Sequence, residues 1–138
     1  MRQSKLTAWL LGFPGIMIAI AFILISVHQS DLVKNKQANQ IEFENTYVFI
    51  QGAGTSTKIQ YEDVQSLDLV DHVDTVRAIS DDYFNGIAET KDYGDCTSYV
   101  YPKVKQYIII ETKKKNYIVN EYSIKETKKL YRKWKQRL

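Results

Sequence analysis

The last part of the chain decides the fold: residues 107–138 read YIIIETKKKNYIVNEYSIKETKKLYRKWKQRL. Residues 107–110 and 117–119 are short runs of β-branched and aromatic residues on either side of a basic turn at 113–116. Such runs favour strands, so they predict a β-hairpin. A helix over 123–138 is predicted next, from an apolar stripe of helical period that contains Ile124, Thr127, Leu130, Tyr131, Trp134 and Leu138. The helix should pack on a sheet that the rest of the chain completes.

The predicted helix has a clear start signal. Ser123 is a good N-cap and Glu126, three residues later, completes a capping box, while Asn120 is the other candidate cap. Cations crowd the last turns, where they complement the helix dipole: Arg132, Lys133, Lys135 and Arg137.

Short apolar runs spaced about ten residues apart predict six further strands upstream, at 41–50, 57–60, 66–70, 75–79, 87–91 and 97–101. Gly52 marks a turn after the first run, and Pro102 ends the last one or confines it to a sheet edge. In the fourth run, Val76 and Ile79 should be buried. The expected fold class is therefore mainly β with one C-terminal α-helix, a small antiparallel barrel or sandwich capped by that helix.

An uncharged apolar stretch of 22 residues lies between Leu6 and Val27. As a helix it would span about 33 Å, enough for a hydrocarbon core of about 30 Å. The alternative is a cleaved signal peptide, but the stretch exceeds the usual apolar region of about 7–15 residues and lacks a small-x-small site after it. We therefore expect residues 1–28 to be a transmembrane anchor with a short tail at 1–5, residues 29–40 to be a polar linker, and residues 41–138 to be the folded domain.

Lysine and arginine beside the span set its orientation. Arg2 and Lys5 come before it, and Lys34 and Lys36 come shortly after it. Because the first pair lies closer to the span, we expect a single-pass protein of the cell membrane with its tail inside and its domain outside the cytoplasm.

The net charge is only +3, but its distribution is uneven. Residues 31–92 have 12 acidic and 5 basic side chains, and residues 93–138 have 12 basic and 4 acidic ones. The two parts can compensate each other after folding, which would leave the cations as a solvated surface. The cations that could instead meet anionic lipid are Lys113, Lys114 and Lys115 in the hairpin turn and Lys125, Lys129 and Arg132 on the helix. Nucleic acid is not expected, because the aromatic residues here point into the predicted core.

The sequence shows no catalytic or metal-binding constellation, and no cofactor is expected. His72 is the only histidine after residue 28, so a two-histidine metal site is not available within one chain. Its neighbours Asp71 and Asp74 should hold the imidazole in a surface loop, and the local aspartates lack the spacing of an EF-hand. Cys96 is the single cysteine, which excludes a disulfide within the chain, and we expect it to be a half-buried filler in a strand.

Several short segments form a further pattern: Asp63-Val64, Leu67-Asp68-Leu69, Arg77, Gly86, Tyr93-Gly94, Tyr99-Val100-Tyr101 and residues 108–112, 117–120 and 126–131. Together they resemble the bacterial pleckstrin-homology-like (PH-like) domain family, over roughly residues 41–134. The sequence departs from that pattern at Ser80, where a glycine is frequent, and at Ala88, where an aromatic residue is frequent. The resemblance implies a curved barrel of about seven strands capped by the C-terminal helix, without enzyme chemistry and without a fixed ligand.

From these features we expect a non-catalytic binding or scaffolding module that one span anchors in the membrane, not an enzyme. The alternative is an envelope-located accessory or immunity-type protein that acts on one protein partner. No motif in the sequence identifies the lipid or protein that either kind of module would bind.

Overall fold

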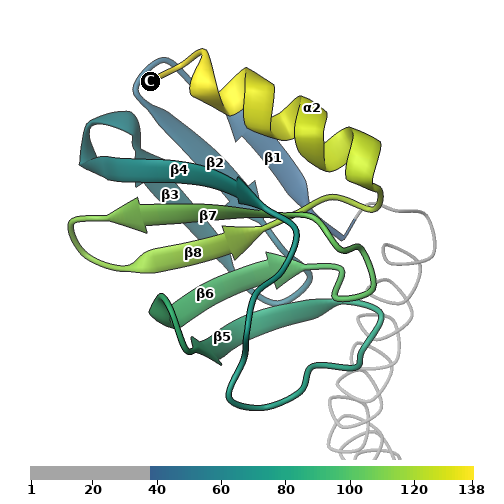
Figure 1. Ribbon diagram of the computed structural model, residues 1–138. Coiled ribbons are helices and arrows are strands. Elements are labelled where there is room, and N and C mark those ends of the chain that lie inside the picture. Colours follow the sequence, from purple (N-terminus) through teal and green to yellow (C-terminus); the bar gives the residue numbers. More distant parts are fainter. Residues whose placement is uncertain (1–37) are drawn as a thin grey trace, which may run out of the picture.

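The computed structural model describes residues 38–138, which form two β-sheets and one helix (Figure 1). The elements are β1 (Gln40–Phe43), β2 (Tyr47–Gln51), β3 (Ser56–Gln60), a 3-10 turn (Tyr61–Asp63), β4 (Val64–Val70), β5 (Phe84–Thr90), β6 (Gly94–Val100), β7 (Tyr107–Thr112), β8 (Asn116–Val119) and α2 (Ile124–Lys135). The first sheet has the order β1-β2-β3 and the second the order β4-β7-β8-β6-β5. The mainly β fold class with one C-terminal helix is confirmed.

The C-terminal hairpin forms as predicted, with Ile109 of β7 opposite Ile118 of β8. The expectation of an antiparallel sheet is wrong at one pair, because β8 also pairs with β6 in parallel. The reason is the connection at 101–106, which places β7 one strand position away from β6 and leaves a gap between the two strands. β8 then fills the gap between β6 and β7.

The predicted first strand at 41–50 is two strands, β1 and β2, joined by a tight turn. The turn is closed by a hydrogen bond of 2.8 Å from the Glu44 amide to the Tyr47 carbonyl. Its residues, Glu44, Asn45 and Thr46, are polar, so the chain reverses between the two apolar runs.

The predicted strand at 75–79 is wrong. Residues 71–83 form an irregular connection whose contact with the sheet edge is a single bridge between Thr75 and Thr90. Val76, expected to be buried, is 59% exposed, and Ile79 is half-buried. β5 begins at Phe84, before the predicted start at residue 87. Its seven-residue pairing with β6 fixes the sheet edge, and the polar residues around 71–74 and 80–82 keep the preceding segment out of the ladder.

The main core lies between the two sheets and α2. Its buried members are Val48, Ile50, Ile59, Leu67, Tyr99, Ile108, Ile110, Tyr117, Val119, Leu130 and Trp134. A second cluster on the other face of the five-stranded sheet contains Cys96, Val100, Tyr107, Ile109 and Ile118. Because β7 is covered on both faces, consecutive residues 107–110 are all buried. Cys96 is fully buried within β6, not half-buried as expected, because it belongs to this second cluster.

The helix begins as the capping signal predicts: Ser123 Oγ accepts a hydrogen bond of 3.1 Å from the Glu126 amide. Its buried stripe consists of Thr127, Leu130 and Trp134. The ends of the predicted stripe are wrong, since Ile124 and Leu138 are 47% and 52% exposed. α2 ends at Lys135, before the predicted end at residue 138.

The chain enters the fold before the expected boundary at Ile41. Ala38 and Asn39 are already buried, and Gln40 begins β1. The Ala38 amide donates to Tyr101 Oη at 3.0 Å, and Asn39 Nδ2 donates to the Asn120 carbonyl at 2.7 Å. Within residues 38–138, no helix has both the length and the apolar character needed to cross a bilayer. The predicted span at 6–27 lies outside the described residues.

Candidate functional site

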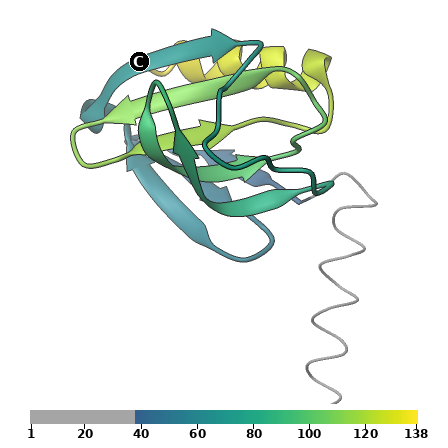
Figure 2. The same cartoon turned by 60° about the horizontal axis from the view of Figure 1, so that its bottom comes forward.

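The six cations proposed from the sequence occupy two separate places. Lys113, Lys114 and Lys115 are exposed in the turn between β7 and β8, while Lys125, Lys129 and Arg132 are exposed on α2. β8 runs from the turn to the start of α2, and α2 then runs back over the sheets, so the turn and the start of α2 lie at opposite ends (Figures 1 and 2). The structure therefore does not bring the six cations into one cluster.

One threonine fixes the backbone of the β7–β8 turn. Thr112 Oγ1 accepts hydrogen bonds from the amides of Lys114 and Lys115, at 3.3 and 3.1 Å, and donates to the Lys115 carbonyl at 2.5 Å. The Lys115 ammonium lies 5.5 Å from the centre of the Tyr117 ring, a cation–π contact. The turn is thus an ordered cationic tip.

A groove of about 340 Å³ runs between β1 and α2. Its apolar residues are Ile41, Phe43 and Leu130, and its charged ones are Glu121, Glu126, Lys129 and Lys133. The Lys133 ammonium lies 5.3 Å from the centre of the Phe43 ring. Burial, with a smaller contribution from the nearby Glu126 carboxylate, raises the pKa of Glu121 to about 7.

The raised pKa of Glu121 predicts a stability that depends on pH. The folded state holds this proton more tightly than the unfolded chain, so the resulting stability is full below the unfolded pKa and is lost as pH rises through about 7. We expect a thermal unfolding midpoint that is higher at pH 5 than at pH 8, with a free-energy difference of about 1–2 kcal/mol after solvent screening. Glu121→Gln should remove that difference. Glu89→Gln, at an exposed position of β5, is the control, and an unchanged pH profile for Glu121→Gln would contradict the assignment.

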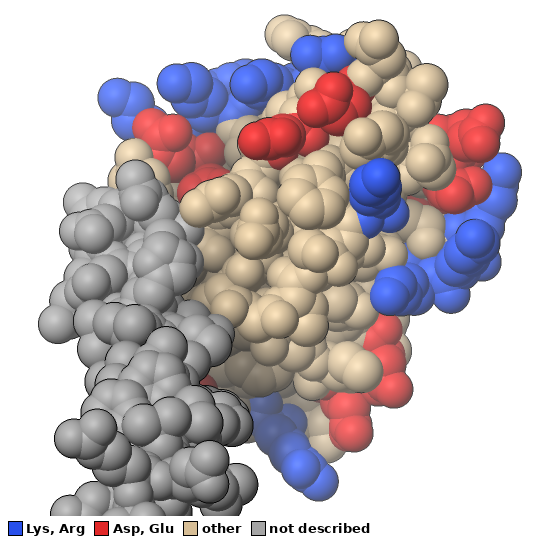
Figure 3. All heavy atoms as spheres, turned by 180° about the vertical axis from the view of Figure 1, so that it is seen from behind, with Lys and Arg blue, Asp and Glu red and all other residues tan. Residues whose placement is uncertain are grey.

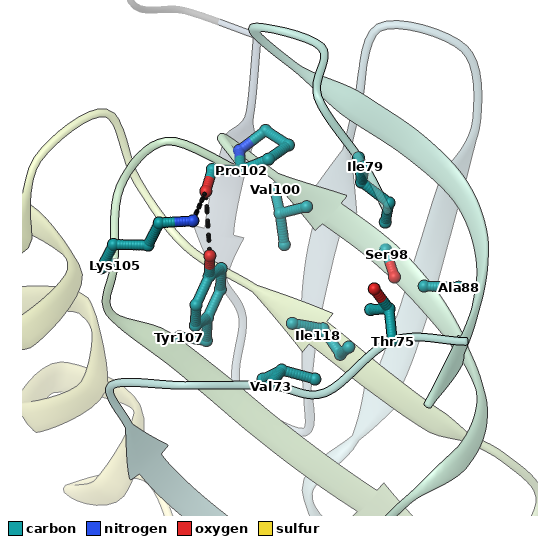
Figure 4. A pocket seen from close by; sticks show the side chains of 10 residues that line it. All are labelled: Val73, Thr75, Ile79, Ala88, Ser98, Val100, Pro102, Lys105, Tyr107 and Ile118. Atoms are coloured by element: carbon teal, nitrogen blue, oxygen red, sulfur yellow. Dashed lines mark hydrogen bonds between the residues drawn. The ribbon is translucent and has the colours of Figure 1, made fainter. Parts of the chain in front are cut away.

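A smaller pocket of about 100 Å³ lies on the outer face of the five-stranded sheet, beneath the 71–83 connection (Figure 4). Its lining comes from that connection, four strands of the sheet (β5, β6, β7 and β8) and the β6–β7 connection: Val73, Thr75, Ile79, Ala88, Ser98, Val100, Pro102, Lys105, Tyr107 and Ile118. Figure 4 shows Lys105 and Tyr107 on one side, and Ile79, Ala88, Thr75 and Ser98 on the other.

Two polar side chains of this pocket, those of Lys105 and Tyr107, meet at one carbonyl. Lys105 Nζ and Tyr107 Oη each donate a hydrogen bond of 3.0 Å to the Pro102 oxygen. Ser98 Oγ donates at 3.1 Å to the carbonyl of Cys96. The pocket thus has apolar walls with an ammonium and a phenol hydroxyl at one side.

The remaining titratable groups offer less chemistry. His72 Nε2 lies 2.6 Å from Asp74 Oδ1, as the sequence suggests, and both side chains are exposed. Burial raises the pKa of the Cys96 thiol, which disfavours the thiolate that a nucleophile needs. Within residues 38–138, no three His, Cys, Asp or Glu side chains lie close enough together to hold a metal ion.

Sequence reasoning missed two asparagines that fix connections of the fold, Asn120 and Asn85. Asn120, considered only as a helix cap, is fully buried and ties down the 101–106 connection beside the pocket. Asn85 Oδ1 accepts from the amides of Gly54 and Thr55 at 2.9 and 2.8 Å, which fixes the β2–β3 turn to β5. Gly52 in that turn has no room for a Cβ, which would lie 2.7 Å from Asn85 Oδ1. The one sequence feature that could have indicated a structural role for either asparagine is the position of Asn120 directly after a predicted strand.

No protein-family model, curated protein or solved structure matches this chain.

Proposed function

We propose that this protein is a non-catalytic binding module, tethered to the cell membrane by the apolar stretch between Leu6 and Val27. In this proposal the domain lies outside the cytoplasm and has a PH-like origin. The stretch is uncharged over 22 residues, and the β-rich domain follows it closely in the chain. Its exposed cations on α2 would meet anionic headgroups of the same bilayer.

The observation that carries this proposal is the place where the chain enters the domain. Asn39 Nδ2 is bonded to the carbonyls of Tyr99 and Asn120, at 2.8 and 2.7 Å, just before the start of α2. Residues 28–37 are the only connection from the apolar stretch to this point. A flexible segment of that length reaches about 17 Å, so the start of α2 would lie close to the bilayer while the β7–β8 turn points away.

The membrane-facing surface can be tested with the full chain in lipid nanodiscs. A fluorophore attached through Lys128→Cys on α2 should be quenched by spin-labelled headgroups, and one attached through Lys114→Cys in the β7–β8 turn should not. Cys96 is fully buried, so the label should go to the introduced thiol. Quenching at position 128 should need anionic lipid and fall as salt rises, because charge attraction is screened beyond about 10 Å at 0.1 M.

A charge-reversal pair provides the matched control. Changing Lys125, Lys129 and Arg132 together to Glu should abolish quenching at position 128. Changing Lys113, Lys114 and Lys115 to Glu makes the same change in charge and should leave it intact. Equal quenching at both positions, or equal loss from both variants, would show that α2 does not face the membrane. Reporter fusions at both ends of the chain test the orientation, and a cytoplasmic C-terminus would overturn it.

The second candidate, an accessory or immunity-type protein with one protein partner, is favoured by the outer face of the β1-β2-β3 sheet. Figure 3 shows that charged side chains lie mainly around the margin of this face. Phe49 and Tyr47 lie on the same face as Lys58, which pairs with Phe49 across the strands and lies 5.0 Å from the Tyr47 ring. Phe49→Lys should abolish capture of a partner from envelope extracts if this face binds one, and should have no effect on headgroup quenching.

A further inference from the structure

The strand β1 has one edge that is open to a further strand. Within residues 38–138, β1 pairs with β2 alone, and the Glu44 amide bonds to the Tyr47 carbonyl where this ladder begins. The hydrogen bonds of an antiparallel ladder alternate, so the backbone of Glu42 also faces β2. The backbone N–H and C=O groups of Ile41 and Phe43 therefore point away from β2, on the side of the groove beside α2.

The other sheet edges carry features that discourage such pairing. Lys58 is exposed in the middle of β3. The pairing of β4 with β7 shifts register between Val64 and Ser66, and β5 already accepts a bond from the Val76 amide at its Glu89 carbonyl. β1 has an unbroken register and no lysine. It is therefore the edge of the described domain best suited to a partner strand.

The groove beside β1 gives such a strand room and a second wall. Its volume of about 340 Å³ lies near the lower end of ligand pockets, about 300–1,000 Å³. α2 forms the wall opposite β1 through residues 126, 129, 130 and 133, which share one face of the helix. Leu130 is buried, and Ile41 and Phe43 are half-buried, so the middle of the groove is apolar.

The two ends of the groove carry opposite charges. Asn39 Nδ2 bonds at 2.7 Å to the carbonyl of the residue before Glu121, so Glu121 lies at the Asn39 end. Glu126 contributes to the raised pKa of Glu121, so two carboxylates meet there. Lys133 lies at the other end, with its ammonium 5.3 Å from the centre of the Phe43 ring. The ion pairs within residues 38–138 lie elsewhere, so no described side chain forms one with Glu121 or Lys133.

We propose that this groove binds an extended segment of a partner protein as an added strand, antiparallel to β1. The segment has an acidic, an apolar and a basic residue at alternate positions, as in Asp-x-Leu-x-Lys. Alternate side chains of a strand point to one face, so all three face α2. The acidic one meets Lys133, the apolar one lies against Ile41 and Leu130, and the basic one meets Glu121 and Glu126. This inference rests on the proposed binding function, but it needs no contact between α2 and the membrane.

The probe is the synthetic peptide acetyl-Thr-Asp-Thr-Leu-Thr-Lys-Thr-amide. It is titrated into the full chain in nanodiscs of zwitterionic lipid, with ¹³C-labelled isoleucine and leucine methyl groups. The pH is 8, above the pKa of about 7 for Glu121, so that this carboxylate is charged. We expect saturable shifts of the Ile41 and Leu130 methyl groups, with a Kd on the order of 1 mM for so short a peptide.

Two altered peptides test the two features of the groove. Methylation of the leucine nitrogen removes an N–H that bonds to β1, and it should weaken binding about fivefold, the loss of one hydrogen bond. Replacing the peptide lysine with glutamate should weaken binding at least about tenfold, because Glu121 and Glu126 then face a carboxylate. General charge attraction predicts the opposite, since the chain has a net charge of +3.

A pair of variants tests the basic end of the groove. Lys133→Gln should weaken binding of the probe about threefold, as for an exposed ion pair. Lys128→Gln makes the same change in charge at an exposed position of α2 that does not line the groove, and it should have no effect. Absence of saturable shifts, equal binding of the three peptides, or equal effects of the two variants would overturn the proposal. The peptide comparison needs no variant, and headgroup quenching at position 128 needs no peptide, so failure of this proposal is distinguishable from failure of the membrane proposal.

Discussion

Replacing Asn120 with alanine is expected to lower the free energy of unfolding by about 3 kcal/mol or more. The side chain is fully buried, and its Oδ1 accepts from the Tyr101 amide at 2.7 Å. Its two Nδ2–H donors are shared among the carbonyls of Tyr101, Val104 and Gln106, whose oxygens lie 3.1, 3.1 and 3.2 Å from Nδ2. Alanine would remove this partner from the Tyr101 amide and from the Val104 and Gln106 carbonyls, whereas the Tyr101 carbonyl keeps its bond of 3.0 Å from the Val104 amide. Each buried group left unpaired costs about 1–3 kcal/mol.

Asn116 provides the control for this prediction. It is the first residue of β8, the strand that Asn120 directly follows, but its side chain makes one hydrogen bond of 2.9 Å, to the Tyr93 carbonyl. Asn116→Ala should therefore cost only about 1 kcal/mol. Asn120→Asp keeps the acceptor but loses the amide donors, so it should destabilise at least as much as Asn120→Ala. Urea unfolding of the full chain in mild detergent, followed by far-ultraviolet circular dichroism, measures all three, and equal effects of the two alanine variants would contradict the role of Asn120.

The features that the sequence predicts correctly are those that local patterns determine. Ser123 and Glu126 are three residues apart, so the start of α2 could be predicted without knowing what the helix covers. The runs at 107–110 and 117–119 are separated by a short polar turn, so their pairing is also local. These segments agree with the observed β7, β8 and α2.

The features that the sequence predicts wrongly depend on distant partners. Val76 has a strand-like residue type, but β5 already pairs with β6 along its length, and the segment around Val76 makes only isolated bonds to β5. The parallel pairing of β6 with β8 follows from the path of residues 101–106, which Asn120 fixes from beyond the hairpin. Single-sequence patterns do not contain such pairings.

The pocket on the five-stranded sheet could not be predicted from the sequence, because it too depends on segments that are distant in the chain. Lys105 and Ile79 are unremarkable in their own segments, and they become neighbours only when the 71–83 connection lies over the sheet. The cations show the converse. Lys115 and Lys125 are ten positions apart in the chain, yet the β7–β8 turn and the start of α2, which contain them, lie at opposite ends of the described domain (Figure 1).

Trp134→Ala is expected to cost about 3–5 kcal/mol, the usual range for removing a large aromatic side chain from a core. Trp134 is fully buried among both sheets, and its ring meets Phe43 edge-on at 6.0 Å between centres. Its Nε1 has no hydrogen-bond partner within the described part of the chain, so Trp134→Phe removes an unpaired N–H and should cost much less than alanine, about 1 kcal/mol. Lys128→Ala, on the exposed side of the same helix, should stay within about 0.5 kcal/mol. Urea unfolding measures the three variants, and a loss for Trp134→Ala as small as that for Lys128→Ala would show that α2 is not packed on the sheets through this ring.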